Sequence, residues 1–184
     1  NKRIGLKDFE SCTIGNVFDI ETINSMSNME DDSRILYPYI VAVGRLVEVK
    51  GFDKLIRAFT KIKKNSLEEL KHVIVGDGPL KFLLNELISS LGMKDHIFLL
   101  GKKENPYPYI KSSLCLVSSS VSEGQPLSIG EAIILGIPVI ATNCEGNAGM
   151  LGDCRYGYLC ENSENGLVTA LYNMLMIPMN HATL

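Results

Sequence analysis

Residues 72–91 read HVIVGDGPLKFLLNELISSL and contain the structural unit that decides the fold. The apolar, β-branched run at its start, His72–Val75, predicts a short buried strand. A Gly-Asp-Gly-Pro turn follows, and from Leu80 to Leu91 apolar residues recur at helical spacing until Gly92. A strand, a tight turn and an amphipathic helix in this order are typical of one unit of an α/β protein.

The same alternation extends in both directions from this unit. We expect further strands at 40–43, 97–100, 114–117 and 137–141, and a weaker strand at 156–160. We expect further helices at 52–62, 128–135 and 165–176. The strands are almost uninterrupted apolar runs, as strands covered on both faces are. The sequence thus predicts a single α/β domain whose parallel sheet has right-handed crossovers and helices on both faces.

The first 35 residues differ from the rest of the chain. They are polar and weakly periodic, and they include the acidic run Glu30-Asp31-Asp32. We interpret residues 1–35 as a lead-in or hinge segment and residues 36–184 as the domain. Because the chain starts at Asn1 without a methionine, we expect it to be a piece of a longer protein.

Composition excludes several classes of protein. The 184 residues are 46% hydrophobic and 21% charged, which is ordinary for a globular domain and excludes disordered and collagen-like chains. A net charge of −3 argues against a nucleic-acid binder, since such proteins depend on basic contacts to phosphates. No apolar run reaches the roughly 18–20 residues that a membrane span needs. We expect membrane association only through parts outside this chain.

The cysteines and histidines show no metal-ligand spacing. The five cysteines are odd in number and form no CxxC pair, so we expect reduced thiols rather than disulfides or a zinc site. His72, His96 and His181 are scattered along the chain. We therefore expect no metal.

The loops after the strands are where chemistry is expected, because open parallel sheets bind ligands at the carboxyl ends of their strands. Gly44-Arg45 and Lys50 surround the turn after the first strand. An arginine fork and a lysine point charge could hold a diphosphate there. The alternative is that both are ordinary surface cations.

The turn Gly76-Asp77-Gly78-Pro79 resembles half of a dinucleotide-binding fingerprint. Lys81 stands in the place of the third glycine. The alternative is a simple helix start, because Pro79 suits the first helical position.

The loop after the fourth strand, residues 118–132, is the richest in polar groups. It leads into an apolar helix that starts near Leu127, and a helix N-terminus with its free N–H groups can bind an anion. Glu123 and Glu131 flank this point and could accept hydrogen bonds from sugar and ribose hydroxyls. The alternative gives both glutamates local roles, at the turn and at the helix start.

Five motifs in this order together resemble one family. They are Gly44-Arg45 with Lys50-Gly51, Gly76-Asp77-Gly78-Pro79, Leu100-Gly101 before Asn105-Pro106, Glu123-Gly124 through Glu131-Ala132, and Gly136 to Thr142. The pattern resembles the C-terminal domain of the group 1 (family four) retaining glycosyltransferases of the GT-B fold, and the glutamates have that family's E-x7-E spacing. The likeness covers roughly residues 12–176, and residues 14–19 resemble the family's domain junction.

The resemblance implies a role for each matching position. The domain would be the Rossmann-like C-terminal half of a GT-B fold, facing an acceptor domain that precedes residue 1. Arg45 and Lys50 would hold the donor diphosphate and neutralise the leaving nucleotide, and Glu123 would contact the donor sugar. Glu131 would accept from the ribose hydroxyls. The other donor-binding positions would be Gly44, Gly78, Gly101, Gly124, Gln125 and Leu127.

The expected function is retaining transfer of a hexose from a nucleoside-diphosphate sugar, with UDP favoured and no cofactor or metal. The acceptor would be a carbohydrate or a lipid-linked sugar, bound through the absent domain during glycan or cell-envelope synthesis. The location would be the cytoplasm or the inner face of its membrane, and the isolated domain would transfer nothing. The alternatives are a nucleotide-sugar epimerase of the related two-domain class and a non-catalytic nucleotide-binding module.

Two positions depart from the family pattern. Pro126 stands where many relatives have glycine, and it removes one backbone N–H donor. Ala148-Gly149 stand where many relatives have a Pro-Glu pair, so the role of that pair is not supported here.

Overall fold

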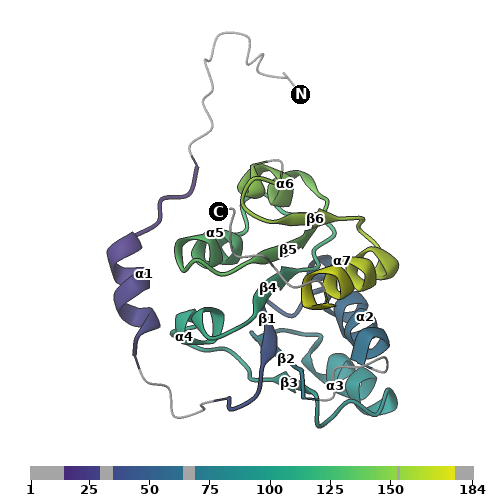
Figure 1. Ribbon diagram of the computed structural model, residues 1–184. Helices are drawn as coiled ribbons and strands as arrows, with labels where there is room; N and C mark the ends of the chain where they lie inside the picture. The colour runs from purple at the N-terminus through teal and green to yellow at the C-terminus, as the bar shows by residue number, and fades with distance from the viewer. Residues whose placement is uncertain (1–14, 30–34, 64–68, 153, 177–184) are drawn as a thin grey trace, which may run out of the picture.

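The computed structural model describes residues 15–29, 35–63, 69–152 and 154–176. Within them, six strands form one sheet in the order β3-β2-β1-β4-β5-β6, and every neighbouring pair is parallel (Figure 1). The strands are β1 (Tyr39–Val43), β2 (Lys71–Val75), β3 (Ile97–Leu99), β4 (Cys115–Ser118), β5 (Val139–Thr142) and β6 (Tyr158–Cys160). All six predicted strands are confirmed, and the strand order reverses between β1 and β4.

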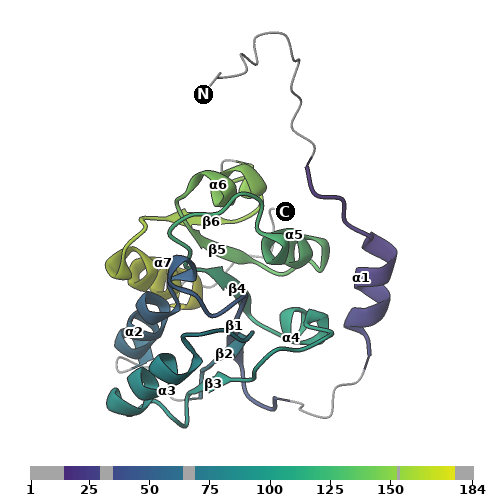
Figure 2. The same ribbon diagram turned by 180° about the vertical axis from the view of Figure 1, so that it is seen from behind.

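Helices cover both faces of the sheet, as predicted (Figures 1 and 2). One face carries α2 (Phe52–Lys63), α3 (Lys81–Ser90) and α7 (Glu164–Met176). The other carries α4 (Tyr107–Lys111), α5 (Leu127–Ile134) and α6 (Glu145–Leu151). Along β1, Ile40 and Ala42 pack into the first layer, while Tyr39 and Val41 pack into the second. This two-sided burial explains why the strands are continuous apolar runs.

Helices α4 and α6 were not predicted from the sequence. The first has only five residues and starts directly after Pro106, with Pro108 in its first turn. The second contains Gly146 and Gly149, which are poor helix formers, so its sequence resembles a polar loop. Tertiary packing stabilises both helices, since Ile110 of α4 and Leu151 of α6 are fully buried.

The lead-in segment also contains a helix that was not predicted, α1 (Ile20–Ser27). Asp19 caps its start. Its carboxylate accepts hydrogen bonds from the Thr22 backbone N–H at 3.0 Å and from the Thr22 hydroxyl at 2.7 Å. These bonds lower the pKa of Asp19.

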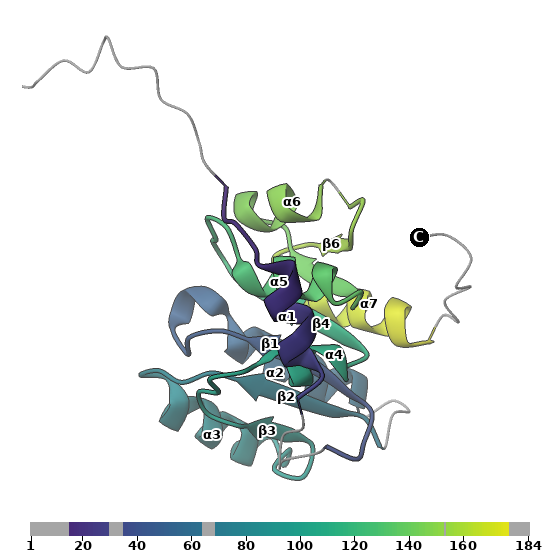
Figure 3. The ribbon, with the colours of Figure 1, turned by 90° about the vertical axis from the view of Figure 1, so that its left-hand side faces the viewer.

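Helix α1 lies across α4 and α5, outside the second helical layer (Figure 3). Ile23, a residue of α1 itself, is buried. The Asn105 side chain donates to the Met26 carbonyl at 2.9 Å, and Lys111 donates to the Asn28 side chain at 2.6 Å. The segment is therefore docked on the domain, and the division of the chain at residue 35 stays a prediction.

The described cysteines, Cys115, Cys144, Cys154 and Cys160, are free thiols, and burial raises the pKa of Cys115 to about 12. Cys12 and His181 lie outside the described residues. Within the described part of the chain, no helix has the length and apolar character to cross a membrane.

His72 is an uncharged side chain inside the core. It is fully buried, its ring lies 5.3 Å from that of Phe59, and neither ring nitrogen has a hydrogen-bond partner among the described residues. Burial lowers the pKa of His72 from 6.5 to about 3. The position of His72 in the core therefore has a cost in stability, because an imidazole must be kept neutral and unpartnered.

Acidification is expected to destabilise the fold through His72. Between pH 6.5 and about pH 3, the unfolded chain binds the imidazole proton and the folded chain does not. Stability should therefore be insensitive to this group above about pH 7, and should fall by about 2 kcal/mol from pH 7 to pH 5. Urea unfolding of the wild type and of His72→Leu at both pH values measures the effect. The leucine variant should lose less stability by that amount, and equal losses would contradict the assignment.

The Phe18 ring packs against Gly130 on α5. A Cβ atom at Gly130 would lie 2.2 Å from the Phe18 Cζ atom, which leaves no room for a side chain. Gly149 on α6 differs, because a Cβ there would meet nothing within 4 Å. The two helical glycines therefore form a matched pair.

Gly130→Ala should lower the free energy of unfolding by about 1–3 kcal/mol, because the methyl group displaces Phe18. Gly149→Ala should raise it by up to about 1 kcal/mol, since alanine favours a helix over glycine. Urea unfolding measures both, and adding Phe18→Ala should remove most of the further cost of Gly130→Ala. Unchanged stability in Gly130→Ala would show that Phe18 does not dock on α5.

Candidate functional site

A cavity of about 350 Å3 lies at the carboxyl ends of β1 and β4, where the strand order reverses. This is the point at which open parallel sheets bind ligands. Its walls come from the loops after β1 and β4, from the start of α5 and from the residue before α4. The lining residues are Val43, Gly44, Lys50, Pro106, Glu123, Gln125, Pro126, Leu127, Ser128 and Glu131. Six of the ten predicted site residues are among them.

Lys50 and Glu123 form an ion pair inside this cavity. Lys50 ends a single 3-10 turn, η1 (Glu48–Lys50), and its side chain passes over Gly44, where a Cβ would lie 3.5 Å from the Lys50 Cε atom. Lys50 Nζ donates to Glu123 Oε1, and the two side chains are 23% and 12% exposed. The Ser120 hydroxyl donates to the same oxygen at 2.6 Å. The pair thus places a cation and a carboxylate at the site with little surrounding water.

The N-terminus of α5 opens toward the same cavity. Pro126 is the N-cap residue, and no side chain caps the first turn. Leu127 and Ser128, the first two residues of the helix, line the cavity. Uncapped N–H groups and the helix dipole favour an anion at this position. Pro126 contributes no N–H, so the donors must come from the residues around it.

Glu131 stands one turn further along α5, beside Tyr107 of α4. Burial raises the pKa of Glu131, and a hydrogen bond from the Tyr107 side chain partly offsets that rise. The pKa of Tyr107 is raised by burial and by the nearby Glu131 charge. Tyr107 was not predicted as a site residue. The only signal was its place directly after the Asn105-Pro106 motif.

Four predicted residues do not line the cavity. Arg45 is exposed beside it, and Gly124 lies between two lining residues with its surface in solvent. Gly78 is a packing glycine, because a Cβ there would lie 2.5 Å from the Leu46 carbonyl oxygen. Gly101 has a φ of +74°, which a glycine adopts without strain. Binding roles for these four stay predictions.

The Gly-Asp-Gly-Pro turn is held by its own side chains. Asp77 accepts from the Gly78 backbone N–H at 2.8 Å and pairs with Lys81 at 2.8 Å. Both contacts lower the pKa of Asp77. Lys81, in the place of the third glycine of a dinucleotide fingerprint, is thus engaged within the turn.

The segment before α1 borders the site. The Asn16 backbone N–H donates to the Gln125 side-chain oxygen at 2.7 Å, and the Asn16 amide donates to the Gln125 carbonyl at 3.3 Å. Phe18 rests on Gly130, next to Glu131. Asn16 was not predicted as part of the site, because such a contact between residues 109 positions apart leaves no local pattern.

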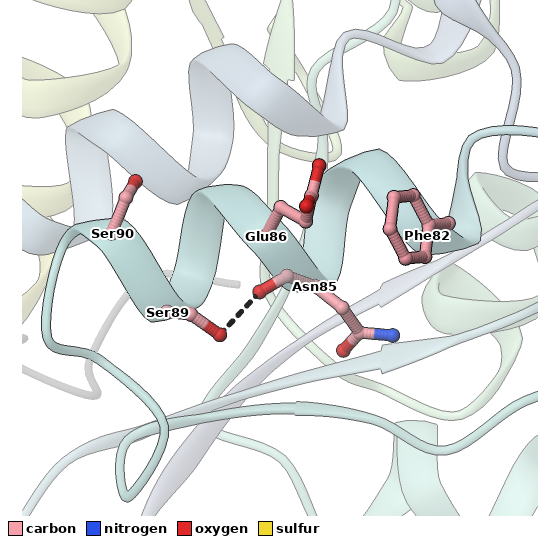
Figure 4. A pocket seen from close by; sticks show the side chains of 5 residues that line it. All are labelled: Phe82, Asn85, Glu86, Ser89 and Ser90. Atoms are coloured by element: carbon pink, nitrogen blue, oxygen red, sulfur yellow. Dashed lines mark hydrogen bonds between the residues drawn. The ribbon is translucent and has the colours of Figure 1, made fainter.

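Two other hollows are found on the described surface. One lies along the outer face of α3, where Phe82, Asn85, Glu86, Ser89 and Ser90 all come from one helix (Figure 4). The Ser89 hydroxyl there is bound to the Asn85 carbonyl at 2.8 Å. Another, between α2 and α3, is lined by leucines that include Leu84 and Leu87 and by the charged residues Glu48, Asp53, Lys54 and Arg57. The cavity at the strand ends is the candidate site because it lies where the strand order reverses and is lined by most of the predicted site residues.

The chemistry of that cavity suits a phosphorylated polyol. A lysine and a helix N-terminus attract an anion, while two carboxylates accept from hydroxyl groups. Among the described residues, no three His, Cys, Asp or Glu side chains are grouped as metal ligands would be.

Comparisons with known proteins agree with this geometry. A family model described as glycosyl transferases group 1 matches residues 31–176. An uncharacterized glycosyltransferase of Methanocaldococcus jannaschii is 36% identical over 155 residues, covering 79% of this chain and 38% of the relative. An N-acetylgalactosamine-N,N'-diacetylbacillosaminyl-diphospho-undecaprenol 4-alpha-N-acetylgalactosaminyltransferase of Campylobacter jejuni is 33% identical over 87% of this chain and 43% of its own length. The chain thus spans less than half the length of these relatives.

Solved structures show the same fold. The pneumococcal O-GlcNAc transferase GtfA, in complex with UDP and GlcNAc, superposes with a TM-score of 0.69. It is 27% identical, and the match covers 75% of this chain and 29% of that one. With a family model that spans most of its length, and with the sheet order and site described above, this chain belongs to the group 1 glycosyl transferases and has a Rossmann-like domain of their GT-B fold.

Proposed function

We propose that this chain is the donor-binding domain of a retaining hexosyltransferase that uses a nucleoside-diphosphate sugar, with UDP as the favoured nucleotide. The observation that carries the proposal is the cavity that brings together the Lys50–Glu123 pair, the uncapped start of α5 and Glu131. UDP is supported by the similar pneumococcal transferase, whose structure is a complex with UDP and GlcNAc.

In this proposal, different residues bind different parts of the donor. Lys50 and the first turn of α5 hold the diphosphate and stabilise the negative charge that develops on the leaving nucleotide. Glu123 accepts from hydroxyls of the transferred sugar, and Glu131 accepts from the ribose. Arg45 lies exposed beside the cavity and adds a second cation near the diphosphate. This division requires no metal, because the charges come from the protein.

The acceptor side belongs to parts outside this chain. We propose a carbohydrate or lipid-linked acceptor, handled in the cytoplasm or at the inner face of its membrane. The Campylobacter relative supports a lipid-linked class, since its name describes a diphospho-undecaprenol substrate.

Removal of the Lys50 charge should weaken nucleotide binding. Lys50→Met removes a charged hydrogen bond to the diphosphate and leaves Glu123 unpaired beside the anion. The expected cost is about 1.5–3 kcal/mol, or roughly a 10- to 150-fold rise in the Kd for UDP. Arg45→Ala should fall at the lower end of this range because Arg45 is exposed. Calorimetric titration with UDP, GDP and ADP measures these effects.

Lys94→Met is the matched control for this titration. Lys94 is exposed and precedes β3, at the opposite edge of the sheet, so the same loss of charge should leave the Kd within about twofold. Equal affinity of the Lys50→Met variant and the wild type would rule out a diphosphate site at Lys50.

Donor binding should weaken on acidification. The weakening should begin at a higher pH than protonation of an ordinary glutamate would give. Burial raises the pKa of Glu131, so its carboxylate takes up a proton early as the pH falls and stops accepting from the ribose. UDP-glucose is the suitable probe, since its diphosphate has no proton to bind in this range. The Kd measured from pH 8 to pH 5 should rise for the wild type and stay nearly flat for Glu131→Gln. Parallel curves for the two proteins would refute the role of Glu131.

A further inference from the structure

The end of β4 carries three consecutive serines at buried positions. Ser119 and Ser120 are each only 2% exposed, and Ser118 is 9% exposed. Hydroxyl groups are costly to bury and need hydrogen-bond partners when they are. The partners of these serines lead directly to the candidate site.

Two of the serines contact Lys50 and Glu123, which form the ion pair of the cavity. The Ser119 hydroxyl donates to the Lys50 carbonyl at 2.8 Å, which ties the β1 loop to β4. The Ser120 hydroxyl donates to Glu123 Oε1 at 2.6 Å. Since Lys50 Nζ donates to the same atom, Oε1 already has two donors. Oε2 of Glu123 has no partner among the described residues, so it is available to a hydroxyl of a ligand.

Two residues that follow β4 in the chain, Thr142 and Asn147, form hydrogen bonds with the serines. Thr142 ends β5, the neighbour of β4 (Figure 1), and is fully buried. Its hydroxyl donates to the Ser120 carbonyl at 2.5 Å. The Asn147 amide, also fully buried, donates to the Thr142 carbonyl at 2.8 Å, and its oxygen accepts from the Ser118 hydroxyl at 3.4 Å.

The backbone completes this support. A Cβ atom at Gly146 would lie 2.3 Å from the Glu123 carbonyl oxygen and 2.4 Å from that of Gly124. The start of α6 therefore rests directly on the peptide groups of the Glu123 loop. The start of α6 thereby helps to set the position of that loop.

We propose that Ser120 and Thr142 are positioning residues for the sugar half of the donor: they hold Glu123 so that its free oxygen meets a hydroxyl of the transferred sugar. The inference rests on the proposed function. It adds that affinity for the sugar, as distinct from the nucleotide, depends on a threonine at the end of β5 that does not line the cavity.

The test compares Thr142→Val with Thr142→Ser in the 184-residue chain. Valine keeps the shape and removes the hydroxyl, whereas serine keeps the hydroxyl. The Kd values for UDP, UDP-glucose and UDP-N-acetylglucosamine are measured by calorimetry, and a melting curve confirms that each variant is folded. Ser120→Ala, which removes the direct donor to Glu123, is measured in the same way.

Thr142→Val and Ser120→Ala should weaken the tighter-binding UDP-sugar by roughly five- to tenfold and UDP by less than about twofold. Thr142→Ser should stay within about twofold for every ligand. If Thr142→Val and Ser120→Ala weaken UDP and UDP-sugar by the same factor, or weaken neither, the positioning role is overturned and the proposed function stands. If the wild type binds no UDP and no UDP-sugar, the proposed function fails and the inference fails with it.

Discussion

The side-by-side pairing of β1 and β4 is the constraint on which the rest of the molecule depends. Ile40 pairs with Cys115 in parallel register, and the strand order reverses at this point. The crossovers from the two strands leave toward opposite faces of the sheet, so their loops diverge and leave space between them. Contact at Gly51 limits that space, because a Cβ there would lie 2.4 Å from the Ser119 carbonyl oxygen. Lys50, from one loop, can therefore reach Glu123 on the other.

The fold was largely predictable because its main signals are local. Two-sided burial makes each strand an apolar run, and one-sided packing gives α2 and α3 their helical stripes. The helices that escaped prediction lack such signals. Helix α6 contains two glycines, α4 begins among prolines, and α1 is mostly polar with one buried isoleucine, Ile23. These three are stabilised by contacts with distant parts of the chain, which periodicity cannot reveal.

The site was predictable where residue type and position coincide. Lys50 and Glu123 lie in the loops after β1 and β4, Glu131 lies one turn into α5, and all three line the cavity. Residues that act through long-range contacts were not found. Asn16 reaches Gln125 across the docked segment, and Thr142 supports the Glu123 loop from a neighbouring strand. Residue type and spacing alone also do not show whether a side chain lines the cavity. The charge and spacing of Arg45 suit a diphosphate, yet Arg45 lies exposed beside the cavity.

The most direct test of the central claim is amide chemical-shift mapping of the isotope-labelled chain during titration with UDP. If the nucleotide binds between the loops that follow β1 and β4, the largest shifts should fall on the amides of Gly44, Gly124 and Leu127. The amide shifts of the outer face of α3, around Asn85 and Ser89, should not change. Shifts confined to α3 or to the groove between α2 and α3, with none at the start of α5, would contradict a nucleotide site at the carboxyl ends of β1 and β4.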